Sequence, residues 1–254
     1  MLARVCVSAR LPSQRMWMKG EQALSAELPV GRILPRRTPP PRMKLLPSPT
    51  TRAVSHPHPP RVLVFSGSTR VGSVNRLLAQ AAARALSETG ISTRLVDLRD
   101  YPMPLYDGDL EAEGGAPQSV LDFQRLVREH DALVIASPEY NGSFSALIKN
   151  VIDWISRPGP GEPPLAVFRD KTAAIMSASP GRGGGRRGLR HLRELLQMVG
   201  VHVIAPELAI ASAKEAFSPD GHLVRPSDRE TLRTMLEALE EAIASSRTGQ
   251  VSRF

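Results

Sequence analysis

The fold of this chain is decided by residues 62–75, which read Val-Leu-Val-Phe-Ser-Gly-Ser-Thr-Arg-Val-Gly-Ser-Val-Asn. The apolar run Val62–Phe65 predicts a strand that is buried on both faces. Small residues follow it, and a helical pattern starts at once after them. Such a loop presents backbone N–H groups, hydroxyl groups and the positive end of a helix dipole. We therefore expect residues 66–75, the first loop, to bind an anion.

Downstream of this stretch, short β-rich runs alternate with helical runs, which predicts a parallel sheet covered by helices on both faces. Five strands are expected, at residues 61–66, 91–98, 132–136, 171–177 and 201–210, with Pro206 at an irregularity of the last. Helices are expected to start near Ser73, Ser119 and Ser227, the last two with capping boxes. Residues 99–118 read as a long loop.

Three loops of small residues follow the strands of this predicted sheet, where open α/β sheets bind their ligands. They are the first loop, the second loop at residues 137–143 and the third loop at residues 177–185. The first loop matches neither the P-loop nor the dinucleotide fingerprint. Its donors suit a monophosphate and are Ser68, Thr69, Arg70, Ser73 and Asn75. The alternative is an ordinary strand-to-helix turn with an exposed arginine.

The second loop contains Pro138-Glu139-Tyr140-Asn141-Gly142, which offers backbone amides and one aromatic ring. A flavin ring needs N–H donors along its edge and a flat wall, which Tyr140 could supply. The alternative is that Tyr140 closes a surface loop. Glu139 could be a general base or a structural carboxylate. In the third loop, Ser177 and Gly181 are further candidates for contacts with the ring, while Arg182, Arg186 and Arg187 could simply be solvated.

The charge of the chain is divided unevenly along its 254 residues, whose formal net charge is +8. Residues 1–60 hold ten Lys/Arg against Glu21 and Glu27, so residues 61–254 are neutral. The net charge therefore gives no reason to expect nucleic-acid binding by the domain. We expect a disordered, basic, Pro-rich extension at 1–60, with a targeting segment, a later start at Met18 or Met43, or a nucleic-acid-binding tail as alternatives. No apolar run could span a membrane. With a single cysteine, we expect a cytoplasmic protein.

With these loops in place, residues 62–208 resemble the NADPH-dependent FMN reductase family, the flavodoxin-like quinone, chromate and azo reductases. The resemblance rests on the sequence of the first loop and on Pro138–Ser143 with the following Leu147–Trp154. Asp97-Leu-Arg-Asp100, leading to Pro104-Leu-Tyr106, and the glycines before Leu189 add to it. One departure is Ser145-Ala146, where many members have Pro-Gly, and we expect it to change the entry into the helix.

The resemblance implies a flavodoxin-like three-layer fold with strand order 2-1-3-4-5. It implies that the FMN phosphate is bound by Ser68, Arg70, Ser73 and Asn75, and that the ring is lined by Pro138, Glu139, Tyr140, Asn141 and Gly142. It also implies a homodimer or homotetramer with flavin sites near the interface.

We therefore expect an FMN-dependent NAD(P)H oxidoreductase that uses NADPH or NADH to reduce a small acceptor. The acceptor is left open among quinones, free flavin, azo compounds and metal oxyanions such as chromate. No side chain is assigned as a catalytic acid or base. The scattered histidines show no metal-ligand spacing, so no metal is expected. The alternatives are a flavodoxin-like electron carrier and a non-catalytic flavin-binding module.

Overall fold

The computed structural model describes residues 58–159 and 161–248. The expectations for residues 1–57 lie outside them, and the domain boundary after residue 60 stays a prediction. The elements are β1 (Arg61–Ser66), α1 (Val74–Glu88), β2 (Ser92–Val96), α2 (Gly108–Gly114), α3 (Gln118–Glu129), β3 (Ala132–Ala136), β4 (Glu139–Tyr140), β5 (Ser143–Phe144), α4 (Ala146–Ile155), β6 (Thr172–Ala178), α5 (Arg186–Met198), β7 (His202–Val203), β8 (Leu208–Ile210) and α6 (Pro226–Arg247). Among the described residues, no helix is long and apolar enough to cross a membrane.

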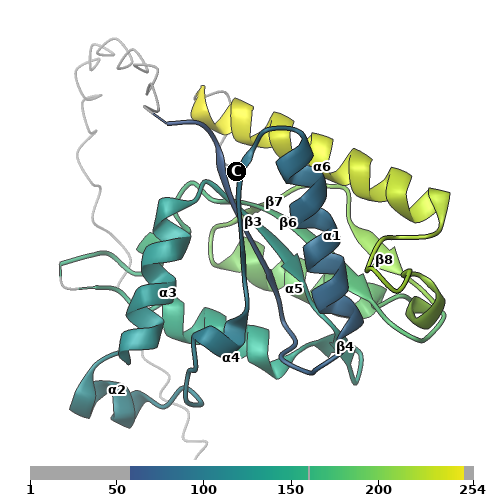
Figure 1. Ribbon diagram of the computed structural model, residues 1–254. Helices are drawn as coiled ribbons and strands as arrows, with labels where there is room; N and C mark the ends of the chain where they lie inside the picture. Colours follow the sequence, from purple (N-terminus) through teal and green to yellow (C-terminus); the bar gives the residue numbers. More distant parts are fainter. Residues whose placement is uncertain (1–57, 160, 249–254) are drawn as a thin grey trace, which may run out of the picture. The chain divides into compact units, whose positions relative to one another are not determined.

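The strands form one parallel sheet in the order β2-β1-β3-β6, with β7 and β8 both paired to β6 (Figure 1). β7 and β8 together occupy the fifth position, so the expected order 2-1-3-4-5 is confirmed. Pro206 lies in the break between them, because proline has no N–H for the ladder. Arg193 of α5 donates to the carbonyls of Val203 and Ile204 at 3.2 and 2.7 Å.

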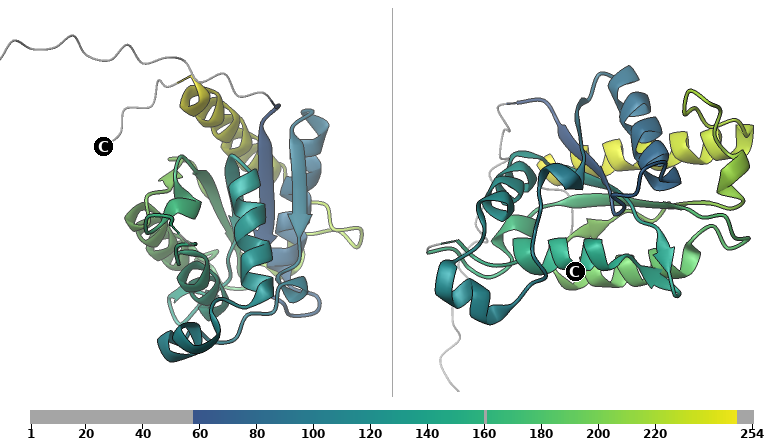
Figure 2. Two further views of the ribbon diagram at one scale, coloured as in Figure 1. Left: turned by 90° about the vertical axis from the view of Figure 1, so that its left-hand side faces the viewer. Right: turned by 60° about the horizontal axis from the view of Figure 1, so that its bottom comes forward.

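Helices cover both faces of this sheet, which explains the continuous apolarity of its strands (Figure 2). α1 and α6 pack on the face that includes Val62 and Val64, and their buried side chains include Leu78 and Leu239. α3, α4 and α5 pack on the opposite face. Alternate residues of β1 therefore belong to two separate cores. This is the three-layer α/β fold that the pattern predicted.

The second loop contains a β-hairpin that the sequence analysis missed. β4 and β5 pair antiparallel, and the two residues between them are Asn141 and Gly142, with φ of 51° and 80°. Positive φ at both positions is the requirement of a type I′ turn, for which Asn-Gly is the strongest short sequence signal. The dipeptide could therefore have predicted the hairpin.

Both expected capping boxes are wrong. α3 begins at Gln118 after Pro117, and the Ser119 hydroxyl donates to the carbonyl of Pro102 instead. α6 begins at Pro226, so Ser227 lies inside the first turn. The expected loop at 99–118 contains the short helix α2, whose N-cap Asp107 accepts from the N–H of Asp109 at 2.9 Å.

Candidate functional site

The first loop lies at the carboxyl end of β1 with most of its backbone donors unused. Within the described part of the chain, the N–H groups of residues 68–72, 74 and 75 donate no hydrogen bond. The side chains of Ser68 and Ser73 are buried and their hydroxyls have no partner there, while Arg70 is exposed. Several orphan N–H groups beside a helix N-terminus and a guanidinium form an anion site. These residues fit a phosphate group.

Asn75 has a different position from the other candidates, because its amide is already hydrogen-bonded. Its Nδ2 donates to the carbonyl oxygen of Ala178 at 2.8 Å, and its Oδ1 accepts from the N–H of Ala178 at 2.9 Å. The pairing of β3 with β6 ends at Met176, so Ala178 has no strand on that side. The Asn75 amide replaces the missing peptide group of the ladder. The backbone N–H of Asn75 donates no hydrogen bond within the described residues, so it is a donor that Asn75 can offer to a ligand without breaking the bonds to Ala178.

Ser145 joins the first loop to the second and begins α4. Its Oγ donates to the carbonyl of Gly67 at 2.7 Å and accepts from the N–H of Ile148 at 3.3 Å. This is an N-cap bond, and the expected change of helix entry at Ser145-Ala146 therefore takes the form of a regular serine cap. A Cβ on Gly67 would lie 2.5 Å from the Ile148 side chain, so the approach of the two segments requires glycine.

Glu139 joins the second loop to α5, the helix that follows the third loop. Its Oε2 accepts from the N–H of Gly188 at 3.0 Å, in the first turn of α5. A carboxylate there stabilises the helix dipole. In this structure Glu139 therefore acts as a structural carboxylate, one of its two expected roles. Tyr140, next to it, is 53% exposed and free to contact a ligand, whereas Pro138 is buried.

Ser177 and Gly181 differ in accessibility. Ser177 is completely buried, and its hydroxyl has no partner among the described residues. A Cβ on Gly185 would lie 2.0 Å from this hydroxyl, so the third loop is seated directly on Ser177. Gly181 is exposed and accessible to a ligand. Ser177 packs beneath Gly185 of the third loop. The sequence did not indicate that Ser177 is buried whereas Gly181 is exposed.

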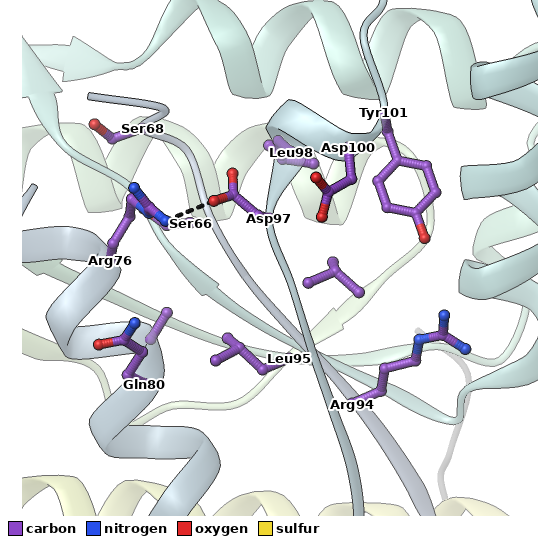
Figure 3. A pocket seen from close by; sticks show the side chains of 12 residues that line it. Ser66, Ser68, Arg76, Gln80, Arg94, Leu95, Asp97, Leu98, Asp100 and Tyr101 are labelled. Atoms are coloured by element: carbon purple, nitrogen blue, oxygen red, sulfur yellow. Dashed lines mark hydrogen bonds and ion pairs between the residues drawn. The ribbon is translucent and has the colours of Figure 1, made fainter. Parts of the chain in front are cut away.

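A cavity of about 360 Å³ opens beside the first loop, between α1 and the end of β2 (Figure 3). Ser68 lines it together with Arg76, Asp97, Asp100 and Tyr101. Arg76 and Asp97 form an ion pair at 2.6 Å, which holds α1 against the end of β2. A hydrogen bond from the Arg99 guanidinium keeps the pKa of the Asp97 carboxyl below its ordinary value. The motif Asp97-Leu-Arg-Asp100 contributes to the family resemblance, but the sequence did not predict the cavity that it lines.

The segment after β2 is fixed to α4. The indole N–H of Trp154 donates to the carbonyl of Pro104 at 2.8 Å, and Asn150 accepts from the N–H of Tyr106 at 2.8 Å. The Tyr106 hydroxyl donates to Glu111, and this bond raises the pKa of Tyr106. Leu105, between these anchored residues, is 81% exposed. The segment thus presents an apolar side chain from a rigid base at the same end of the sheet.

Comparison with known proteins shows which family this chain is similar to. The model of the family described as NADPH-dependent FMN reductase matches residues 60–215. The chain is 42% identical over 181 residues to an NAD(P)H-dependent FMN reductase of Pseudomonas aeruginosa, a match that covers 71% of this chain and 93% of the relative. It is 37% identical over 185 residues to an NADPH:quinone oxidoreductase of Arabidopsis thaliana, covering 71% and 90%.

A quinone reductase of Escherichia coli is 32% identical to this chain over 185 residues, covering 72% of this chain and 95% of the relative. Among solved structures, the flavoenzyme NAD(P)H:(acceptor) oxidoreductase FerB of Paracoccus denitrificans superposes with a TM-score of 0.64 at 29% identity. That match covers 74% of this chain and 98% of FerB.

Proposed function

Because this chain belongs to the NADPH-dependent FMN reductase family, we propose that it passes a hydride from NADPH or NADH through FMN to a small quinone-type acceptor. Membership makes the protein an oxidoreductase whose cofactor is FMN and whose reductant is NAD(P)H. FMN, when bound, supplies the redox chemistry by accepting two electrons and a proton and releasing them to the acceptor. The residues of the chain would bind FMN, orient its ring and polarise it through hydrogen bonds.

The observation that carries this proposal is the set of unpaired donors in the first loop. Backbone N–H groups from Ser68 to Gly72, with the unpaired hydroxyls of Ser68 and Ser73, would hold a phosphate. Arg70 would add one full positive charge, because its guanidinium pairs with phosphate oxygens. Asn75 would contribute its backbone N–H while its amide fixes the loop.

The ring would lie against the second and third loops. Tyr140 offers a flat wall, and Gly142 permits close backbone approach because it has no side chain. Pro138 and Glu139 set the shape of the hairpin, the latter through Gly188. Gly181, exposed in the third loop, would contact the ring, while Ser177 is buried beneath Gly185 of that loop. We assign no side chain as a general acid or base, since the Glu139 carboxylate is engaged by α5.

The acceptor and the assembly are finer proposals. Relatives named as quinone reductases favour a quinone over free flavin, an azo compound or chromate. We propose a homodimer or homotetramer, because Val71, Leu105 and Tyr140 expose apolar surface at the end of the sheet that carries the site. Size-exclusion chromatography with light scattering measures the mass of the assembly directly. The cytoplasmic location stays a prediction.

Steady-state oxidation of NADPH by the FMN-loaded protein, with menadione or ferricyanide as acceptor, tests the proposal. An electron carrier or a non-catalytic flavin-binding module would bind FMN stoichiometrically without turnover, and that outcome would contradict the enzyme. A colourless protein that takes up no FMN would contradict the flavin site itself. Variation of the acceptor at fixed NADPH then ranks quinone, flavin, azo compound and chromate by kcat/KM.

A further inference from the structure

Four arginines without a partner surround the third loop and the start of α5. They are Arg182, Arg186, Arg187 and Arg190, all exposed, and in the described part of the chain none forms an ion pair or donates a side-chain hydrogen bond. Arg193, one turn further along α5, contrasts with them because it pairs with Glu207 at 3.1 Å. The four cannot be explained as counterions of neighbouring acidic side chains.

These arginines lie beside the proposed ring pocket. α5 is fastened to the hairpin by the bond between Glu139 and Gly188. A Cβ on Gly142 would lie 4.0 Å from the Cδ of Arg187, which places the Arg187 side chain along the Asn141–Gly142 turn. The Arg187 side chain therefore lies beside the hairpin that carries Tyr140, and Arg186 and Arg190 lie on the same helix, α5.

The positive end of the α5 dipole is already balanced by the Glu139 carboxylate, so what remains at this edge is the charge of the guanidinium groups. A cluster of forked guanidinium donors suits a phosphate monoester, whose oxygens accept bidentate hydrogen bonds. The two reductants open to this enzyme differ only in such a group, because NADPH carries a 2′-phosphate on its adenosine ribose and NADH a hydroxyl.

We propose that Arg186 and Arg187, flanked by Arg182 and Arg190, bind the 2′-phosphate of NADPH and so give this enzyme its preference for NADPH over NADH. The inference rests on the proposed function, since it concerns how the reductant reaches the flavin pocket. Arg70 lies in the first loop and belongs to the separate phosphate site of FMN. The cluster thus recognises the phosphate that distinguishes the two reductants.

The test uses the full-length, FMN-loaded protein and the double variant Arg186→Ala/Arg187→Ala. Loss of charge-assisted bonds to one phosphate should lower the ratio of kcat/KM for NADPH to that for NADH by roughly tenfold to hundredfold. The matched control is Arg169→Ala, which removes an exposed arginine that precedes β6 instead of following it. Its ratio should stay at the wild-type value.

Calorimetry with 2′,5′-ADP and with 5′-AMP provides a readout independent of turnover. The double variant should lose affinity for 2′,5′-ADP by a similar factor and keep its affinity for 5′-AMP, which lacks only the 2′-phosphate. If the double variant keeps the wild-type ratio of kcat/KM for NADPH to that for NADH, or loses equal affinity for the two nucleotides, the inference is overturned. The proposed reductase function would not be affected by either result. An FMN-loaded wild-type protein that oxidises neither NADPH nor NADH would overturn the proposed function, and the inference with it.

Discussion

Replacing Asn75 with alanine should destabilise the protein before any ligand is involved. The Asn75 amide makes two hydrogen bonds to the backbone of Ala178, at 2.8 and 2.9 Å, and both residues are no more than 2% exposed. Ser137 donates to Met176 at 2.9 Å from the end of β3, so the backbone of Ala178, two residues on, faces the same side beyond that strand. Without the amide, the N–H and C=O of Ala178 lose the partners that Asn75 supplies.

The magnitude follows from those two bonds. Each buried hydrogen bond contributes about 1 kcal/mol net, and each buried polar group left unpaired costs about 1–3 kcal/mol. Water reaching the opened site recovers part of this cost, so we expect Asn75→Ala to lower the free energy of unfolding by about 2–4 kcal/mol. Asn75→Asp should lose a similar amount, because a carboxylate accepts from the N–H of Ala178 but cannot donate to its carbonyl.

Urea unfolding of the FMN-free protein, followed by circular dichroism, measures the effect without contribution from bound flavin. Gln80→Ala is a suitable control, since Gln80 lies on the same helix and makes no side-chain hydrogen bond in the described part of the chain. The reasoning is refuted if Asn75→Ala unfolds at the same urea concentration as Gln80→Ala. In that case Asn75 would be a ligand residue and not part of the framework.

Three further changes separate the roles of neighbouring groups. Arg70→Ala should weaken FMN binding by roughly 1.5–3 kcal/mol in fluorescence titration while the unfolding midpoint of the FMN-free protein stays unchanged; equal FMN affinity would remove Arg70 from the phosphate site. Ser145→Ala should cost about 1–2 kcal/mol in urea unfolding, because it removes both the α4 cap and the bond to Gly67, and a neutral effect would contradict that linkage. Burial lowers the pKa of His130 below its usual 6.5, so the folded state disfavours the charged ring and stability should fall as the pH drops below about 6.5. That slope should flatten in His130→Gln, and an identical slope in the variant would assign the pH dependence to other groups.

The sequence allowed the sheet and its loops to be predicted because these depend on local patterns. Continuous apolar runs such as Val62–Phe65 marked the buried strands, and their order of alternation with helices placed the loops at one edge. Helix starts were less predictable, since Ser119 and Ser227 satisfy a capping pattern that tertiary contacts override. The Ser119 hydroxyl donates to the carbonyl of Pro102, and α6 begins at Pro226, before Ser227.

The hydrogen-bond partners of individual site residues could not be predicted from the sequence, because these partners lie far apart along the chain. Asn75 and Ala178 are 103 residues apart, and Glu139 and Gly188 are 49 apart. Nothing local in either segment records such a pairing, so a polar side chain in a ligand loop looks the same whether it binds a ligand or the protein. The roles predicted for Arg70 and Tyr140 stay predictions, and their exposed side chains make no hydrogen bond among the described residues that would compete with them.

These bonds explain how the loops of the proposed flavin site can be held in position before FMN binds. Asn75 joins the first loop to the end of β6, Ser145 joins the first to the second, and Glu139 joins the second to α5 behind the third. The first loop is therefore connected to the end of β6 and to the start of α4, while its N–H groups from Ser68 to Gly72 donate no hydrogen bond among the described residues. Preorganised donors bind an anion without an additional ordering cost. It follows that a lost framework bond should lower stability and flavin affinity together, whereas a lost ligand contact such as Arg70 should lower affinity alone.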